Sequence, residues 1–237
     1  MSSSNEFGQP GPTPSGFRLI KGVAEVKPDW LKLYLISDSK LFPPEKVLES
    51  FEAALKGGIR DIQLREKDLS LSDLLSLAIV LRQMTASYEA RLYINGRLDI
   101  ALMVEADGVH LPEDGLPANE VKARYPHLLV GVSTHSLESA KQAETNGADF
   151  ITFSPIFATS SKAQYGEPQG LEKLQSVTQA VQIPVLALGG IDKHRINTVL
   201  ETGAHGVAMI SAIWSSPNIK NASLEFMKFF AGDSHNV

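Results

Sequence analysis

Short apolar runs alternate with longer segments of helical periodicity along most of the chain. Val47, Phe51 and Leu55 recur every four residues and would share one face of a helix, and Leu74 and Leu81 belong to a second segment of this kind. Between such segments lie runs rich in β-branched, aromatic and aliphatic residues, which predict strands. The predicted strands are 32–38, 59–65, 91–95, 108–111, 128–133, 150–157, 184–189 and 206–213.

Glycine follows the helical pattern at several helix-to-strand junctions. Gly58, Gly147 and Gly203 each stand just past a helical segment, where a glycine ends a helix at low conformational cost. Eight strand–helix units joined by right-handed crossovers predict a single-domain α/β protein, a closed (β/α)₈ TIM barrel. A doubly wound open sheet is the alternative, but it would have to place some of the eight similar units in an unusual order.

The composition narrows the function classes. The chain has 237 residues, no cysteine and a formal net charge of -5, which excludes disulfides, thiolate zinc sites and cysteine nucleophiles. This charge gives no general attraction to nucleic acid or to membranes. The apolar runs are shorter than the roughly 18 residues of a membrane span. We expect a cytoplasmic protein that binds small molecules, and the sequence leaves open whether it pairs into a homodimer.

The two ends of the barrel region differ in character. Residues 1–16 are rich in Ser, Gly and Pro, without the basic start and apolar stretch of a signal peptide, and are expected to form a disordered leader. Residues 17–237 are expected to form the barrel, with a helix at its C-terminal end.

In a barrel of this kind the chemistry lies where the strands end. After the second strand, Gln63, Arg65 and Lys67 would fall on the axial face if the extended conformation continues. An amide followed by two cations in an interior predicts an anionic ligand. The alternative is that Arg65 pairs with an interior carboxylate and Lys67 is a solvated loop residue.

Polar residues also end the third and fifth strands. Asn95 closes the third, and Ser133 and His135 stand at the mouth of the fifth. A lone histidine is often structural, but its place at a strand end makes His135 equally a candidate general acid and base.

The loops after the last three strands suit a phosphate. Hydroxyl groups and an ammonium follow the sixth strand, and glycines follow the seventh, where backbone N–H groups bind phosphate in many barrels. A hydrophilic loop and a tight turn are the plain alternatives. The candidates are Thr159, Ser161, Lys162, Gly189, Gly190 and Ser211.

Several segments, in order along residues 31–215, resemble the thiamine phosphate synthase family, which also contains thiazole tautomerases. They include Gln-Leu-Arg-Glu-Lys-Asp at 63–68, Gly-Val-Ser-Thr-His at 131–135 and Leu-Gly-Gly-Ile at 188–191. The other matching segments are 33–36, 108–111 and 155–162.

The resemblance implies a set of roles. In the synthase a pyrimidine diphosphate loses pyrophosphate, and the nitrogen of a thiazole phosphate captures the resulting cation, with Mg²⁺ supporting the leaving group. Tyr34 would stack on the pyrimidine, and Ser133 and Gly190 would also line the substrate site. The diphosphate side would be Gln63, Arg65, Lys67, Asn95 and Lys162, and the thiazole phosphate would lie on Thr159, Ser161, Gly189 and Ser211.

The chain departs from the synthase pattern at both metal-binding aspartates. The first aspartate follows the asparagine of the third strand, where this chain has Gly96. The second ends a His-Leu-Gly-Gln-Glu-Asp segment, where this chain has Gly115. Asp114 stands one residue early and would bind a metal only if the loop changed register. Loss of both carboxylates should slow a metal-dependent reaction by orders of magnitude.

We therefore expect a thiazole tautomerase, which isomerises a thiazole carboxylate phosphate by proton transfer and needs neither metal nor diphosphate. His135 would move the proton, and Lys162 is the other catalytic candidate. The first alternative is a thiamine phosphate synthase that uses Mg²⁺ held by Asp114 or another ligand. The second is a non-catalytic regulator that binds thiazole phosphate.

Overall fold

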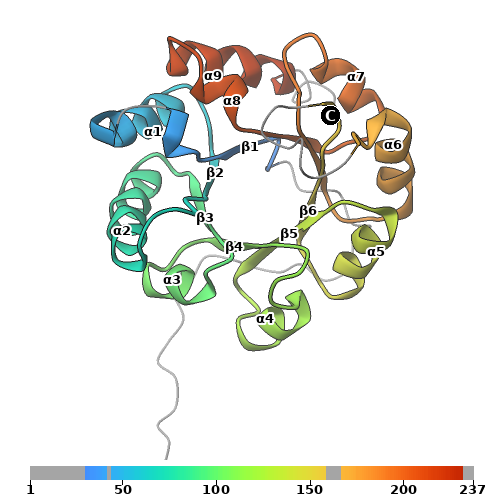
Figure 1. Ribbon diagram of the computed structural model, residues 1–237, viewed down its shortest axis with the longest axis horizontal. Coiled ribbons are helices and arrows are strands. Elements are labelled where there is room, and N and C mark those ends of the chain that lie inside the picture. Colours follow the sequence, from blue (N-terminus) through green and yellow to red (C-terminus); the bar gives the residue numbers. More distant parts are fainter. Residues whose placement is uncertain (1–29, 42–43, 159–166, 232–237) are drawn as a thin grey trace, which may run out of the picture.

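The computed structural model describes residues 30–41, 44–158 and 167–231, and this part of the chain forms a closed barrel of eight parallel strands (Figure 1). Each strand pairs with its sequence neighbours, and β1 closes the ring by pairing with β8. The predicted (β/α)₈ TIM barrel is confirmed. The strands are β1 Leu33–Ile36, β2 Asp61–Leu64, β3 Arg91–Asn95, β4 Gly108–Leu111, β5 Leu129–Thr134, β6 Phe150–Phe153, β7 Val185–Leu188 and β8 Gly206–Met209.

Helices form a ring around the strands (Figure 1). None of them, within the described residues, has the length and apolar character needed to cross a membrane. The helices are α1 Val47–Lys56, α2 Leu71–Ser87, α3 Leu98–Met103, α4 Ala118–Arg124, α5 Leu137–Thr145, α6 Gly170–Ala180, α7 Ile196–Glu201, α8 Ser211–Trp214 and α9 Ile219–Met227. Short 3₁₀ turns lie at Ser39–Leu41, Pro44–Lys46 and Lys228–Phe230.

Two strands end earlier than their apolar runs predict. The run 150–157 continues past Phe153, where β6 ends, because Ile156 is buried in the following turn. The run 206–213 continues past Met209, where β8 ends, because Ile213 is buried in α8. In both places the burial continues after the strand's hydrogen bonding stops.

The glycines at the ends of α1, α5 and α7 have the predicted conformation. Gly58, Gly147 and Gly203 have φ angles of +94°, +79° and +87°, a left-handed region that a side chain disfavours. At the end of α1 the preceding Gly57 has a different role, because a Cβ there would overlap Ser223 on α9. Gly57 thus lets α9 pack closely on α1, where Figure 1 shows the two helices side by side.

Aromatic side chains fill the barrel interior. Tyr34, Tyr93 and Phe150 are fully buried and pack edge to face, with ring centroids 5.2–5.6 Å apart. Two strand glycines make room for them, because a Cβ on Gly108 would overlap the Tyr93 ring and a Cβ on Gly131 would overlap Phe150. The interior is therefore solid beneath the rim where the strands end.

A buried ion pair lies at the start of β2 and β3. Arg91 donates to both carboxylate oxygens of Asp61, at 2.6 and 3.0 Å, and the Tyr93 hydroxyl donates to the same carboxylate at 3.2 Å. Burial raises the pKa of the Asp61 carboxyl, although the bonds from Arg91 and Tyr93 act in the opposite direction. The guanidinium of Arg91 also lies 4.6 Å from the ring centre of Trp30.

Replacing Asp61 by Ala should destabilise the barrel, because Arg91 and the Tyr93 hydroxyl would lose their acceptor in a buried setting. We expect the free energy of unfolding to fall by about 3 kcal/mol, measured by urea unfolding at pH 7. Asp99→Ala is the matched control, since it removes an exposed carboxylate paired with Arg97 and should leave stability nearly unchanged. Equal losses of unfolding free energy in the two variants would contradict the role of Asp61 as the acceptor of a buried ion pair.

Candidate active site

The end of β2 places only part of the predicted triplet on the barrel interior. Gln63 is buried on β2, and its amide nitrogen donates to the Tyr34 hydroxyl at 3.2 Å. Arg65 follows the strand and is half-buried. The strand ends at Leu64, and Lys67 is exposed in a turn. The expectation that extended backbone carries Lys67 to the same face is therefore wrong.

Glu66 fixes the end of β2 to the end of β1. Its carboxylate accepts from the hydroxyls of Ser37 and Ser39, at 2.5 and 2.6 Å, and from the backbone N–H of Ser39. The Ser37 hydroxyl oxygen in turn accepts from the backbone N–H of Arg65 at 2.8 Å. The loop after β1 and the backbone of Arg65 are thus held together by one acid that the sequence did not single out.

Tyr34 lies below the rim. Its ring is fully buried against Tyr93 and Phe150, so the structure does not leave the ring open for stacking on a ligand. Its hydroxyl reaches Gln63 and, at 3.4 Å, the Nδ1 atom of His110 on β4. Tyr34 therefore supports Gln63 from inside the barrel.

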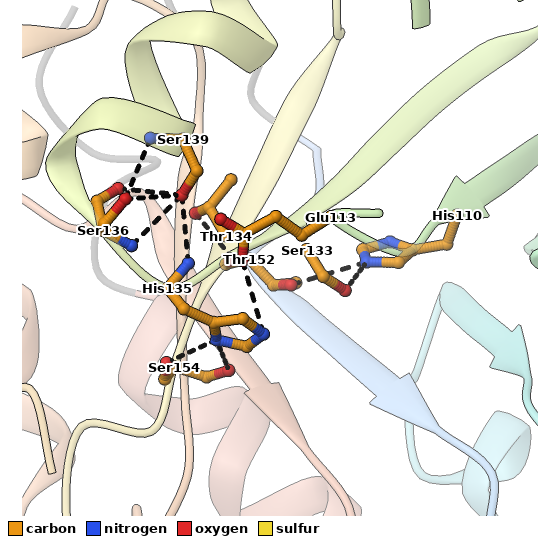
Figure 2. Close-up of polar contacts among 9 residues, drawn as sticks. All are labelled: His110, Glu113, Ser133, Thr134, His135, Ser136, Ser139, Thr152 and Ser154. Atoms are coloured by element: carbon orange, nitrogen blue, oxygen red, sulfur yellow. Dashed lines mark hydrogen bonds and ion pairs between the residues drawn. The ribbon is translucent and has the colours of Figure 1, made fainter. Parts of the chain in front are cut away.

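His135 stands at the mouth of β5 and is held from two sides (Figure 2). Its Nδ1 lies 2.8 Å from the carbonyl oxygen of Ser154, just after β6, and its Nε2 lies 3.8 Å from the carboxylate of Glu113. Its backbone N–H donates to the hydroxyl of Ser139 on α5, at 3.2 Å. Because a carbonyl oxygen only accepts, Nδ1 carries the proton, and in the neutral ring Nε2 presents a lone pair.

Ser133 and Asn95 lie at neighbouring positions of the same rim. The Ser133 hydroxyl is 3.1 Å from Nε2 of His110, and its side chain is half-buried. Asn95 ends β3 opposite His110 in the strand register and is also half-buried. Both predicted residues are therefore at the rim, each beside the buried His110.

The glycines after β7 pack against the segment after β6. Gly189 and Gly190 have φ angles of +108° and +65°. A Cβ on Gly189 would lie 3.0 Å from Pro155, and one on Gly190 would lie 2.8 Å from the Cβ of Phe157. These two glycines thus bring the loop after β7 against the start of the loop after β6.

Of the other residues predicted to bind phosphate, the structure describes only Ser211. Ser211 is the first residue of α8 rather than the end of β8, and it is exposed. Thr159, Ser161 and Lys162 lie outside the described residues, so their predicted roles stay predictions.

Pro112 lies against both positions where the synthase pattern has an aspartate. A Cβ on Gly115 would lie 2.9 Å from Cδ and 3.0 Å from the carbonyl oxygen of Pro112, and one on Gly96 would lie 3.7 Å from the same Cδ. Asp114 is exposed in this loop. Within residues 30–41, 44–158 and 167–231, no group of three or more His, Asp or Glu side chains is placed to hold a metal ion. The donor set of the synthase metal site is therefore not reproduced at these positions.

Comparisons with known proteins place these features in context. The family model described as thiamine monophosphate synthase matches residues 33–213. A protein of Aquifex aeolicus named putative thiamine-phosphate synthase 2 is 53% identical over 180 residues, which cover 76% of this chain and 96% of the relative. A putative thiamine-phosphate synthase of Geobacter sulfurreducens is 49% identical over 187 residues, which cover 78% of this chain and 88% of the relative.

A solved structure is similar over the same region. The thiamine phosphate pyrophosphorylase of Pyrococcus furiosus superposes with a TM-score of 0.77 at 38% identity, covering 84% of this chain and 95% of that one. A 3-hexulose-6-phosphate synthase with a TM-score of 0.63 and 20% identity shares the fold alone.

Proposed function

The chain belongs to the thiamine monophosphate synthase family, and from this premise we propose that it is an enzyme of thiamine biosynthesis that isomerises a phosphorylated thiazole carboxylate by proton transfer. The observation that carries the proposal is the setting of His135, whose Nδ1 is committed to the Ser154 carbonyl while Nε2 faces Glu113. Such a ring can take a proton at Nε2 and return it.

The proton cycle needs no atom beyond the substrate and the protein. Nε2 of neutral His135 removes a proton from one position of the thiazole ring, and the electron pair left behind shifts within the ring system. The same proton returns from Nε2 to a substrate carbon outside the ring, so the ring becomes aromatic and the two isomers have the same composition. Between the two steps the imidazolium pairs with the Glu113 carboxylate, 3.8 Å away, and the Ser154 carbonyl keeps the ring oriented.

The metal positions also support isomerisation over the synthase reaction. In a synthase, Mg²⁺ would stabilise the leaving pyrophosphate. At the two aspartate positions this chain has Gly96 and Gly115, and a side chain at 115 would crowd Pro112. These residues do not fit the metal, so no step is assigned to it.

Thiamine phosphate synthase is the second candidate, and the names of the relatives favour it. The proteins of Aquifex aeolicus and Geobacter sulfurreducens are both named as putative synthases, and these names give the tautomerase no support. In a synthase the diphosphate would meet Gln63, Arg65, Lys67, Asn95 and Lys162.

One assay separates the two candidates. Purified protein is given pyrimidine diphosphate and thiazole phosphate, once with Mg²⁺ and once with EDTA, and is given the unstable thiazole carboxylate isomer in a parallel reaction. We expect conversion of that isomer to the aromatic one at the same rate with Mg²⁺ and with EDTA, and no thiamine phosphate. Thiamine phosphate formed only with Mg²⁺ would establish the synthase and overturn the proposal. Binding of thiazole phosphate with neither product would indicate the regulator.

Replacement of His135 should abolish the isomerisation while leaving the fold intact. We expect His135→Asn to lower kcat at least about a hundredfold, because the amide cannot accept and return a proton. His127→Asn is the matched control, since His127 is exposed in the turn between α4 and β5. Near-normal turnover of the His135 variant, measured by loss of the unstable isomer, would refute the assigned role.

The loop after β7 should be needed to bind the substrate phosphate. In Gly190→Ala the new Cβ would meet Phe157 at 2.8 Å and displace the loop, so we expect the Kd for thiazole phosphate to rise at least about tenfold. Gly170→Ala is a control with a similar backbone strain, because Gly170 has φ +73° but nothing within 4 Å of its Cβ position. Calorimetric titration measures both, and equal affinities would count against a phosphate site at this loop.

A further inference from the structure

A chain of hydrogen-bonding side chains runs through the barrel interior just beneath the rim. It begins at Gln63 on β2, whose amide nitrogen lies 3.2 Å from the Tyr34 hydroxyl. The same hydroxyl lies 3.4 Å from Nδ1 of His110 on β4. The other ring nitrogen, Nε2, lies 3.1 Å from the Ser133 hydroxyl at the mouth of β5, with Thr152 at 3.4 Å. Figure 2 shows the end of the chain, where His110 points toward Ser133 and Thr152.

Because this series of side chains is buried, each of its polar atoms needs a hydrogen-bond partner within the protein. Gln63, Tyr34 and His110 are each 0–1% exposed, so water does not compete for their polar atoms, and an unpaired group would cost stability. Within the described residues, no buried side-chain nitrogen or oxygen atom is without a hydrogen-bond partner. Ser133, at the end of the chain, is half-buried and lies at the site.

The donors and acceptors fix the direction of the chain. The amide nitrogen of Gln63 can only donate, so the Tyr34 oxygen accepts from it. Burial raises the pKa of Tyr34 well above its usual range, so the hydroxyl stays protonated. It therefore donates a hydrogen bond to Nδ1 of His110. A neutral imidazole that accepts at Nδ1 carries its proton at Nε2. His110 then donates to the Ser133 oxygen, which leaves the Ser133 proton directed elsewhere.

We propose that His110 is a positioning residue whose neutral Nε2–H form turns the hydroxyl of Ser133 into a hydrogen-bond donor toward an acceptor atom of the substrate. The same hydrogen-bonded series holds the amide nitrogen of Gln63 on the Tyr34 hydroxyl. The inference rests on the proposed function only in that the ligand is a phosphorylated thiazole.

The first test reads the tautomer without any substrate. In the ¹⁵N-labelled protein at pH 7.5, the His110 ring is expected to show a protonated Nε2 and an unprotonated Nδ1. Tyr34→Phe removes the hydroxyl that donates to Nδ1 and keeps the ring, and we expect the His110 tautomers to become mixed. A wild-type ring protonated at Nδ1, or at both nitrogens, would overturn the proposal. This outcome does not depend on which reaction the enzyme catalyses.

The second test asks whether His110 acts through Ser133. Ser133→Ala and His110→Phe are each expected to raise the Kd for thiazole carboxylate phosphate about tenfold, near the loss of one hydrogen bond. The double variant should bind no more weakly than either single variant, because both remove the same interaction. Additive losses would indicate a merely structural role for His110 and would overturn the proposal.

Control variants distinguish loss of the proposed interaction from misfolding and from failure of the proposed function. Thr152→Val removes the longer partner of Nε2 with little change in shape, and it should leave the affinity unchanged; a tenfold loss there would overturn the assignment to Ser133. If His110→Phe does not fold, His110→Leu takes its place in the cycle, and His110→Gln, whose amide can donate in place of Nε2, is expected to keep most of the affinity. If the wild type has the expected tautomer but binds no thiazole phosphate, the proposed function fails and the donor direction of Ser133 stands.

Discussion

Edge-to-face packing of Tyr34, Tyr93 and Phe150 in the barrel interior is the interaction on which the site depends. The rings meet because Gly108 and Gly131 leave space for them on neighbouring strands. Since these rings fill the interior, the polar side chains at the strand ends pack on a rigid aromatic layer. The Tyr34 hydroxyl, at the edge of this layer, forms hydrogen bonds with Gln63 and His110.

The two sides of the rim are built differently. On the side of β1 and β2, the Glu66 carboxylate ties hydroxyls and backbone into a fixed turn. On the side of β5 and β6, the catalytic candidate His135 is held by the Ser154 carbonyl and faces a half-exposed acid, Glu113. The first side is thus held by hydrogen bonds within the protein, and on the second the Nε2 atom of His135 faces the Glu113 carboxylate.

Much of this architecture follows from local patterns in the sequence. Alternation placed Gln63 inward, and glycines after α5 and α7 marked true helix ends. The apolar runs predicted β6 and β8 to be longer than they are, because a hydrophobic pattern indicates burial and not strand pairing. Lys67 was misplaced for a related reason, since nothing in the residues themselves shows that the strand stops at Leu64.

The partners of the two histidines could not be read from the chain. Glu113 lies 22 residues before His135 and Ser154 lies 19 residues after it, so only the closed barrel brings them together. His110 was visible as part of a family-like segment, and its position on β4 beside Asn95 in the register could have drawn attention to it. Its link to Ser133 requires the tertiary structure, because the two residues are on adjacent strands joined through α4.

The contact between Pro112 and Gly115 also constrains how this sequence can change over evolutionary time. A Cβ at 115 would lie 2.9 Å from Cδ and 3.0 Å from the backbone carbonyl oxygen of Pro112, so an aspartate at 115 would require this loop to shift. At position 96 a Cβ would meet the same ring only at ordinary contact distance, but the φ angle of +66° there disfavours a side chain. Aspartates at both positions would therefore require the backbone of both loops to adjust, in addition to the two side-chain changes.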